Sequence, residues 1–411
     1  MEEWKEYKLG DLYDVHNGLS KGGKFFGSGY PFLSFKTVFN NYFLPSVLPD
    51  LVQSDKKEQS GYDIKRGDVF VTRTSETPEE LGMSSVALKD YPFATYNGFT
   101  KRLRPKDTSI IYPEFIGYYL RSTKFRELFY GLASSMSTRA SLANGDLLGM
   151  RVFLPTFATQ EKIAKILKSL DDKIEVNRRI NDNLEQQAQA LFKSWFVDFE
   201  PFKDQPLNET EIGMIPQGWR LSTIGEITKQ KTSRVGTLTD IKVLSPVTTG
   251  DLVPSEEYFT KKVYSESIAK YKIVEMGDFA YNPARVNIGS LGRNDYEYRG
   301  CVSPVYVVFE CKNGYSHFFD LFRRTEKFKT EVKSRAIGGV RQSLNYKDFA
   351  LIQTIVPPID VVYAFDSIYD RLKTMQKHVE KENTGLTELR DTLLPRLISG
   401  EFKVNDIEKD L

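Results

Sequence analysis

The most constraining feature of this chain of 411 residues is that its second half repeats its first. The segment that begins at Trp4 returns at Trp219, with apolar residues, a glycine and an acidic residue in matching places. Gly67-Asp68 likewise returns as Gly277-Asp278, and from Arg139 onward the shift settles at 202 positions and holds. A period near 200 residues indicates a duplicated domain, because solenoid repeats run to roughly 20–50 residues. Two similar modules in one chain suggest one ligand with two related sites, and a long polymer such as DNA fits best.

The composition excludes several classes of protein. The formal net charge is only +2, which is too small to identify a nucleic-acid-binding protein by itself. Cys301 and Cys311 are the only cysteines and the histidines number three, so neither a disulfide framework nor a Cys/His zinc site is expected. The charged start and the lack of an apolar run of about 18 residues predict a cytoplasmic protein without membrane contact.

The two repeats predict two strand-rich modules, at residues 1–155 and 219–358. Short apolar runs bounded by Gly, Pro and Asn are typical of strands and turns. One helix is expected in each module, from Pro113 to about Tyr130 and from His317 to Ser334. Residues 201–218, rich in Pro, Gly and acidic side chains, are expected to be a linker.

A long helix is expected after each module, at residues 156–200 and, with a tail, at 359–411. Residues 160–199 contain no Gly or Pro, and their apolar positions alternate at spacings of four and three, which is typical of a coiled-coil seam. The second segment repeats the seam, although Gly385 and Pro395 should make that helix less regular near its end. The predicted fold is α+β: two strand-rich globular modules joined by two long antiparallel coiled-coil helices, with a pseudo-twofold internal repeat.

Polar and aromatic residues interrupt the predicted seam. Asn177 and Asn181 lie in its middle, and Asn383 occupies the position equivalent to Asn181. They indicate either a solvated stretch of an imperfect coil or paired amides that fix register and orientation. Trp195 and Phe196 close the first helix, and we expect them to bury against a partner protein or the adjacent module. Simple packing of the coil end is an equal alternative.

Three segments carry a resemblance to a known family: 191–199 (LFKSWFVDF), 213–219 (GMIPQGW) and 393–400 (LLPRLISG). Their order and spacing resemble the specificity subunit of type I restriction–modification systems over essentially all 411 residues. The resemblance implies two target-recognition domains, each reading one half of an asymmetric bipartite site in double-stranded DNA. It also implies that the helices set the gap and dock two methyltransferase subunits, with restriction-motor subunits as further partners. S-adenosylmethionine, ATP and magnesium would then belong to those partners, and this chain would hold no catalytic centre.

Candidate DNA contacts are basic and polar side chains on loops that differ between the modules, because such side chains read base edges. Residues 72–76 follow the Gly-Asp pair of the first module, and residues 282–287 occupy the matching place in the second. Basic clusters at 101–106, 121–126 and 323–341 indicate either phosphate contacts or solvated faces. The candidates are Lys21, Lys24, Lys36, Arg73, Thr74, Ser75, Arg102 and Arg139 in the first module, and Lys231, Arg234, Asn282, Arg285, Asn287, Arg335 and Arg341 in the second.

Two other functions fit parts of the sequence. Asp50, Asp63 and Lys65 form a loose nuclease-like pattern that could hold magnesium and activate water. The long helices alone would suit an adaptor that binds only protein. Residues 18–25 nearly match a phosphate loop, but Phe25 stands where a Ser or Thr would bind magnesium, so a loop near a DNA phosphate is favoured.

Overall fold

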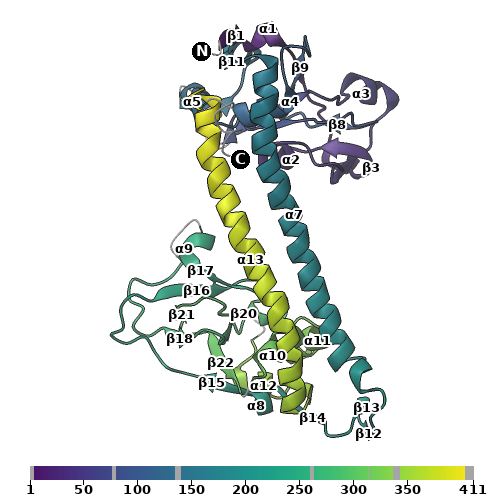
Figure 1. Cartoon of the computed structure of the whole chain (residues 1–411), viewed down its shortest axis with the longest axis vertical. Coiled ribbons are helices and arrows are strands. Elements are labelled where there is room, and N and C mark those ends of the chain that lie inside the picture. The colour runs from purple at the N-terminus through teal and green to yellow at the C-terminus, as the bar shows by residue number, and fades with distance from the viewer. Residues whose placement is uncertain are drawn as a thin grey trace. The chain divides into compact units, whose positions relative to one another are not determined.

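The computed structural model describes residues 4–75, 80–134, 140–259, 263–312, 314–336 and 343–402. The chain forms two compact units, of which unit 1 comprises Met1–Arg178 and Glu380–Leu411 and unit 2 comprises Arg179–Val379. Each unit holds one strand-rich module and part of two long helices, α7 (Phe157–Phe196) and α13 (Ile359–Ile398) (Figure 1). This combination of sheets and long helices confirms the predicted α+β class.

Unit 1 contains short strands and helices around the long-helix segments. Its strands are β1 (Lys5–Lys8), β2 (Tyr13–Asn17), β3 (Phe26–Leu33), β4 (Asp50–Val52), β5 (Val69–Thr72), β6 (Thr74–Ser75), β7 (Ser84–Val86), β8 (Thr95–Tyr96), β9 (Thr100–Pro105), β10 (Ala140–Ser141) and β11 (Arg151–Leu154). Its short helices are α1 (Leu9–Leu12), the 3-10 helix η1 (Gly23–Phe25), α2 (Phe35–Asn40), α3 (Lys56–Gly61), α4 (Pro113–Tyr119), α5 (Thr123–Ser134) and α6 (Asn144–Gly149).

Unit 2 is built from a similar set of elements. Its strands are β12 (Leu207–Thr210), β13 (Gly213–Pro216), β14 (Arg220–Thr223), β15 (Thr228–Lys231), β16 (Lys242–Pro246), β17 (Leu252–Pro254), β18 (Lys272–Val274), β19 (Phe279–Tyr281), β20 (Leu291–Arg293), β21 (Gly300–Val302), β22 (Val307–Cys311) and β23 (Gln353–Val356). Its short helices are η3 (Glu200–Phe202), α8 (Ile224–Ile227), α9 (Ser255–Tyr258), η4 (Val286–Ile288), α10 (Ser316–Phe322), α11 (Glu326–Arg335) and α12 (Tyr346–Phe349).

The two modules share one strand topology. The main sheet of unit 1 has the order β2-β9-β5-β7, and that of unit 2 has the equivalent order β15-β22-β19-β20, with antiparallel pairing throughout. In both modules the strand that opens the repeat pairs with the strand before the long helix, β1 with β11 and β14 with β23. The internal repeat predicted from sequence is therefore a repeat of architecture.

The repeated Gly-Asp pair forms the same tight turn in both modules. Gly67 and Gly277 have φ values of +90° and +84°, which a residue with a Cβ rarely adopts. The carboxylate of the following aspartate accepts a hydrogen bond from a backbone N–H three residues earlier, at 2.8 Å in each case. This turn sets the start of β5 and of β19, and therefore the place where the loop after each strand emerges.

The single helix predicted in each module is wrong, because two shorter helices stand in its place. In unit 1, α4 ends at Tyr119 and α5 begins at Thr123. Ser122 bonds the carbonyl of Tyr119 and accepts from the N–H of Phe125, so it closes one helix and starts the next. Thr325 caps α11 in the same way, with its hydroxyl accepting from Phe328 N–H. A side chain that bonds nearby backbone groups favours a helix end over a helix interior.

The segments of α7 and α13 run antiparallel within each unit. In unit 1, Asp171 bonds Arg390 while Asn177, one and a half turns later, bonds Asn383. In unit 2, Gln376 bonds the carbonyl of Asn181 while the ring of Phe192 packs against Phe365. As residue numbers rise along α7, the partners on α13 fall, as expected for an antiparallel pair. α13 continues through Pro395 to Ile398, with Leu394 and Leu397 buried in the core.

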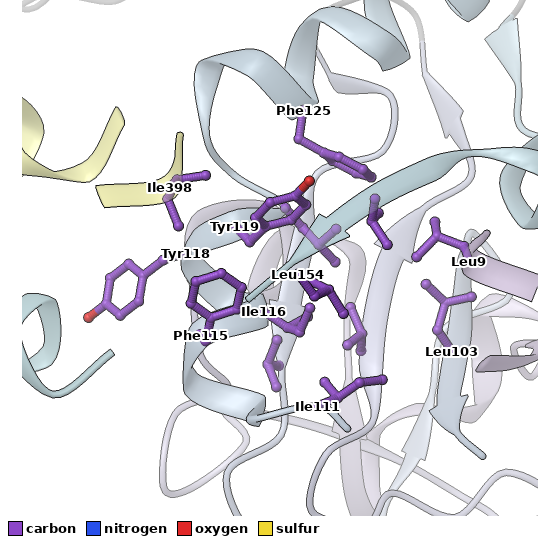
Figure 2. Close-up of a cluster of buried hydrophobic side chains, with 14 of the residues drawn as sticks. Leu9, Leu103, Ile111, Phe115, Ile116, Tyr118, Tyr119, Phe125, Leu154 and Ile398 are labelled. Carbon is purple, nitrogen blue, oxygen red and sulfur yellow. The ribbon is translucent and has the colours of Figure 1, made fainter. Parts of the chain in front are cut away.

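Each unit has its own hydrophobic core. In unit 1, Phe115, Ile116 and Tyr119 of α4 cluster with Leu154 of β11 and with Ile398 of α13 (Figure 2). The core of unit 2 joins the main sheet, α10 to α12 and the aromatic end of α7. Burial of these faces fixes the sheet and the long helices of each unit as one frame, from which the variable loops project.

Candidate nucleic-acid interface

The loops that follow β5 and β19 leave the repeated frame at the same place but carry different side chains. The N–H of Leu142 donates to the carbonyl of Arg73 at 2.8 Å, and the N–H of Leu344 donates to the carbonyl of Pro283 at 3.0 Å. These bonds make Arg73 and Pro283 structural counterparts. A shared scaffold with exchanged loop residues is what two readers of different ligand sequences require.

Arg73 and Thr74 of unit 1 are both partly exposed. Arg73 N–H bonds the carbonyl of Phe99 at 3.0 Å, and its Nε has no hydrogen-bond partner among the residues described. Thr74 and Ser75 form β6, which pairs with β10. The exposed ring of Phe99 lies beside this edge and was missed by the sequence analysis, which considered only polar side chains.

Three further lysines of unit 1 have different environments. Lys21 forms an ion pair with Glu58 at 2.7 Å and donates to the carbonyl of Gln53, so its charge is largely satisfied within the module. Lys24 is exposed, with its Nζ 5.1 Å from the ring centroid of Phe25. Lys36 is exposed on α2. The last two are free to meet a phosphate.

Arg102 has an internal position that differs from the loop position expected for a DNA contact. Its side chain is buried on β9, donates to Asp63 at 2.9 Å and lies over the ring of Tyr96. Arg104 bonds the same aspartate at 3.0 Å and Asp68 at 2.6 Å. Burial would raise the pKa of Asp63, but the two arginines hold it below its usual range. Arg102 therefore stabilises the sheet in this structure.

The same ion-pair network argues against the nuclease alternative. Asp63 is occupied by two guanidinium groups, whereas a magnesium ligand must present free carboxylate oxygens. Within the described ranges no cluster of three or more His, Cys, Asp or Glu residues could hold a metal ion. The nuclease reading is therefore not supported by the arrangement of Asp63 and Lys65.

In unit 2, Asn282 and Arg285 line a cavity of about 370 Å³ together with Tyr306. Asn282 Oδ1 accepts from the N–H of Ala284 at 3.0 Å, which fixes the loop, and Arg285 is exposed. Burial raises the pKa of the Tyr306 phenol, and the nearby Arg285 opposes this effect. Asn287 is partly buried in η4. The two candidates Asn282 and Arg285 are thus brought together at a concave, partly aromatic surface.

The remaining candidates of unit 2 divide into paired and unpaired side chains. Lys231 forms ion pairs with Asp278 at 2.7 Å and Glu310 at 3.7 Å, so it supports the sheet. Arg335 pairs with Glu331 one turn earlier on α11. Arg234 is exposed beside Lys272. Arg139 and Arg341 lie outside the described residues.

Two arginines of the basic clusters serve the fold. Arg121 and Arg323 each follow the first helix of the split pair. Arg121 donates to the carbonyl of Ser84 on β7, and Arg323 donates to the carbonyl of Leu291 on β20, the equivalent strand. Their spacing in sequence did not distinguish this structural role from phosphate binding. Their position between two short helices could have indicated it, but the sequence predicted one continuous helix there.

The coil residues make specific contacts within the units. Asn177, which is 1% exposed, donates to Asn383 Oδ1 at 2.9 Å and to Glu382 at 2.7 Å. Gln376 Nε2 donates to the backbone carbonyl of Asn181 at 3.4 Å. Trp195 and Phe196 pack inside unit 2 in a cluster of aromatic rings that includes Phe202, Trp219, Phe318 and Phe365. The aromatic end of α7 is therefore occupied by its own module.

Comparison with known proteins agrees with this architecture. Residues 1–186 match the family model described as the type I restriction modification DNA specificity domain. The chain is 27% identical to the type I restriction enzyme HindI specificity subunit of Haemophilus influenzae, over 98% of this chain and 100% of that protein. It is 25% identical to the MjaIX specificity subunit of Methanocaldococcus jannaschii, over 99% and 95%.

The fold is also similar to a solved structure. The crystal structure of the type I restriction–modification system S subunit from M. genitalium has a TM-score of 0.56 and 15% identity, with 96% of each chain covered. The chain thus resembles type I specificity subunits over nearly its whole length, and its residues 1–186 match the DNA specificity domain of that family. No helix in the described part of the chain is long and apolar enough to span a membrane.

Proposed function

We propose that this chain selects the DNA sequence on which a type I restriction–modification complex acts. Each module reads one half of an asymmetric bipartite site in double-stranded DNA. The observation that carries the proposal is that the same place on the repeated frame holds different loop residues in the two modules. Arg73 and Thr74 follow β5 in the first module, and Asn282 and Arg285 follow β19 in the second. Polar side chains on such loops can reach base edges in the major groove, so two loops with different side chains would select different bases.

The long helices would act as the spacer and the dock for partner subunits. An α-helix rises by about 1.5 Å per residue, so the paired helices would hold the two modules at a separation set by the helix length. Two methyltransferase subunits would dock on the helices, and restriction-motor subunits would join that complex. The relatives named above are specificity subunits, which supports this assembly.

The chemistry of the complex would reside in those partners. S-adenosylmethionine would bind the methyltransferase subunits, and ATP and magnesium the restriction-motor subunits, in the cytoplasm. The contribution of this chain is recognition, without a catalytic step of its own. Purified chain incubated with magnesium and plasmid DNA should therefore leave the DNA uncut, and nicking that is lost on Asp63→Asn would contradict this assignment.

Methylation sequencing gives the direct test. The chain is co-expressed with the methyltransferase subunit of its own system in a host without adenine methylation, and the modified positions are mapped. One split, asymmetric motif with a fixed gap is expected. Exchanging residues 282–287 should then change one half of the motif and leave the other half and the gap intact. Methylation without a split motif, or a change in both halves, would contradict the proposal.

A further inference from the structure

Two basic side chains of unit 1, Arg73 and Lys101, lie where β5 ends and β9 begins. The antiparallel register places Val71 opposite Lys101, and the next bond along this edge joins Arg73 N–H to Phe99 carbonyl. Lys101 is only 5% exposed, and its Nζ donates to Oδ1 of Asn144 on α6. Arg73 and Lys101 therefore lie at the same end of the two central strands, beside the loop that differs between the modules.

The two charges lack an acidic counterpart in the described structure. Among the described residues no Asp or Glu forms an ion pair with either side chain, and the partner of Lys101 is a neutral amide. Burial lowers the pKa of Lys101, and the positive charge of Arg73 lowers it further. A buried cation without a counter-charge costs free energy, so such a pair is expected to have a ligand.

The second module shows that the fold does not need these cations. In the main sheet of unit 2, Val307 lies opposite Tyr281, just as Lys101 lies opposite Val71 in unit 1. Val307 is therefore the counterpart of Lys101. Pro283 stands at the position of Arg73, as the matching bonds to Leu344 and Leu142 show. Unit 2 forms the same sheet with Val307 and Pro283 at these two positions. The two cations of unit 1 are therefore not needed for the fold, and we infer another role for them.

We propose that Lys101 and Arg73 together bind one phosphodiester of the DNA backbone. The phosphodiester would lie where β5 ends and where β6 and β9 begin. This inference rests on the proposed function and adds a specific anchor to it. A phosphate oxygen would accept from Lys101 Nζ and from the Arg73 guanidinium and would supply the missing negative charge. Phosphate contacts position a protein on the duplex without reading bases. The anchor would thus set how the first module's loop meets its half-site.

The test uses the complex of this chain with its methyltransferase subunits and a duplex that carries the methylated motif. Lys101→Met keeps the length of the side chain and removes the charge. We expect about tenfold weaker binding to both the motif and unrelated DNA, and a salt dependence shallower by about one ion. The thermal unfolding temperature should stay the same or rise. Lys89→Met, at an exposed lysine of the same module, should change neither affinity nor salt dependence.

A second variant tests the site without removing either cation. Asn144→Asp places a carboxylate on the atom that already accepts from Lys101 Nζ. It should stabilise the free protein and weaken DNA binding, because the internal charge competes with the phosphate. Unchanged affinity and salt dependence in both Lys101→Met and Asn144→Asp would overturn the inference and leave the proposed function standing. A wild-type complex that methylates no motif would overturn both.

Discussion

The side-chain amide of Asn177 donates to Oδ1 of Asn383 at 2.9 Å, which joins α7 to α13 within unit 1. Asn177 is almost fully buried between the two helices, and its own Oδ1 has no partner among the described residues. A polar pair in an apolar seam costs stability, yet it disfavours any register in which the amides do not meet.

Replacing both members of this pair should therefore stabilise unit 1. We expect Asn177→Leu with Asn383→Leu to raise the free energy of unfolding by about 1–2 kcal/mol, because the two amides are removed together. Either single substitution should be less favourable by about 1 kcal/mol, since the remaining amide then loses its partner. Denaturant unfolding of the four proteins gives the coupling energy. Additive effects of the two substitutions would show that the amides do not act as a pair.

The antiparallel pairing changes how the spacer hypothesis must be tested. One heptad inserted after Asn181 alone would displace every contact beyond it on one helix. A matched heptad after Met375 on α13 restores the pairing, because Asn181 faces Gln376 and the numbering runs in opposite directions. The paired insertion adds about 10.5 Å, and we expect a gap longer by about three base pairs. Mapping methylated positions checks this, and altered half-site sequences would contradict it.

Asp320 should make unit 2 sensitive to acid. Its carboxylate is buried and pairs with Arg323 at 2.6 Å and Arg324 at 3.0 Å. Burial would raise the pKa of Asp320, but the neighbouring arginines outweigh it and hold the pKa below its ordinary value. The stability that the charged form contributes is thus present above the ordinary aspartate pKa, about 3.9, and is lost as pH falls through the lowered pKa.

Asp320→Asn isolates that contribution. At pH 7 we expect it to lower the free energy of unfolding by about 3 kcal/mol, because it removes the buried negative charge that pairs with both guanidinium groups. The difference from wild type should shrink as pH falls below about 4, because Asp320 of the unfolded chain takes up a proton there while the folded carboxylate is still charged. Denaturant unfolding between pH 3 and pH 7 measures this. A difference that does not vary with pH would show that the carboxylate charge is not what stabilises the helix pair.

Arg121 distinguishes a structural arginine from a DNA contact. Its guanidinium donates to the carbonyls of Ser84 at 2.6 Å, Val38 at 2.7 Å, Phe39 at 2.7 Å and Asn41 at 3.0 Å. Burial lowers its pKa to about 10. Arg121→Met should lower the free energy of unfolding by about 3 kcal/mol, because several carbonyls lose their donor. Unchanged stability with a shallower salt dependence of DNA binding would instead identify a phosphate contact.

Much of the fold follows from short-range patterns in the sequence. The apolar spacing of residues 160–199 is enough to predict a long helix, and α7 spans Phe157–Phe196. The split of the module helix could not be predicted in this way. The residues between α4 and α5 have no Gly or Pro. The break is set by Ser122, which bonds the backbone of Tyr119 and Phe125, and by Arg121, which bonds a strand far away in the chain.

Only part of the candidate interface could be predicted from the sequence. The divergent loops at Arg73 and Asn282 were found because the repeat supplies an internal comparison. Arg102 and Lys231 were chosen for their charge, but both lie in ion pairs whose acidic partners are distant in sequence. Lys101 was one basic residue in a cluster until the structure placed it beside Arg73 with no carboxylate among the described residues.

The sequence by itself determined that this protein has two related modules and two long helices, because repeats and apolar periodicity are local properties of the chain. Only the tertiary structure decided which charged residues face a ligand and which hold the frame. A lysine or arginine has the same sequence signature in both roles. What separates the roles is burial and the identity of the groups within hydrogen-bond distance, and folding brings those groups from tens of residues away.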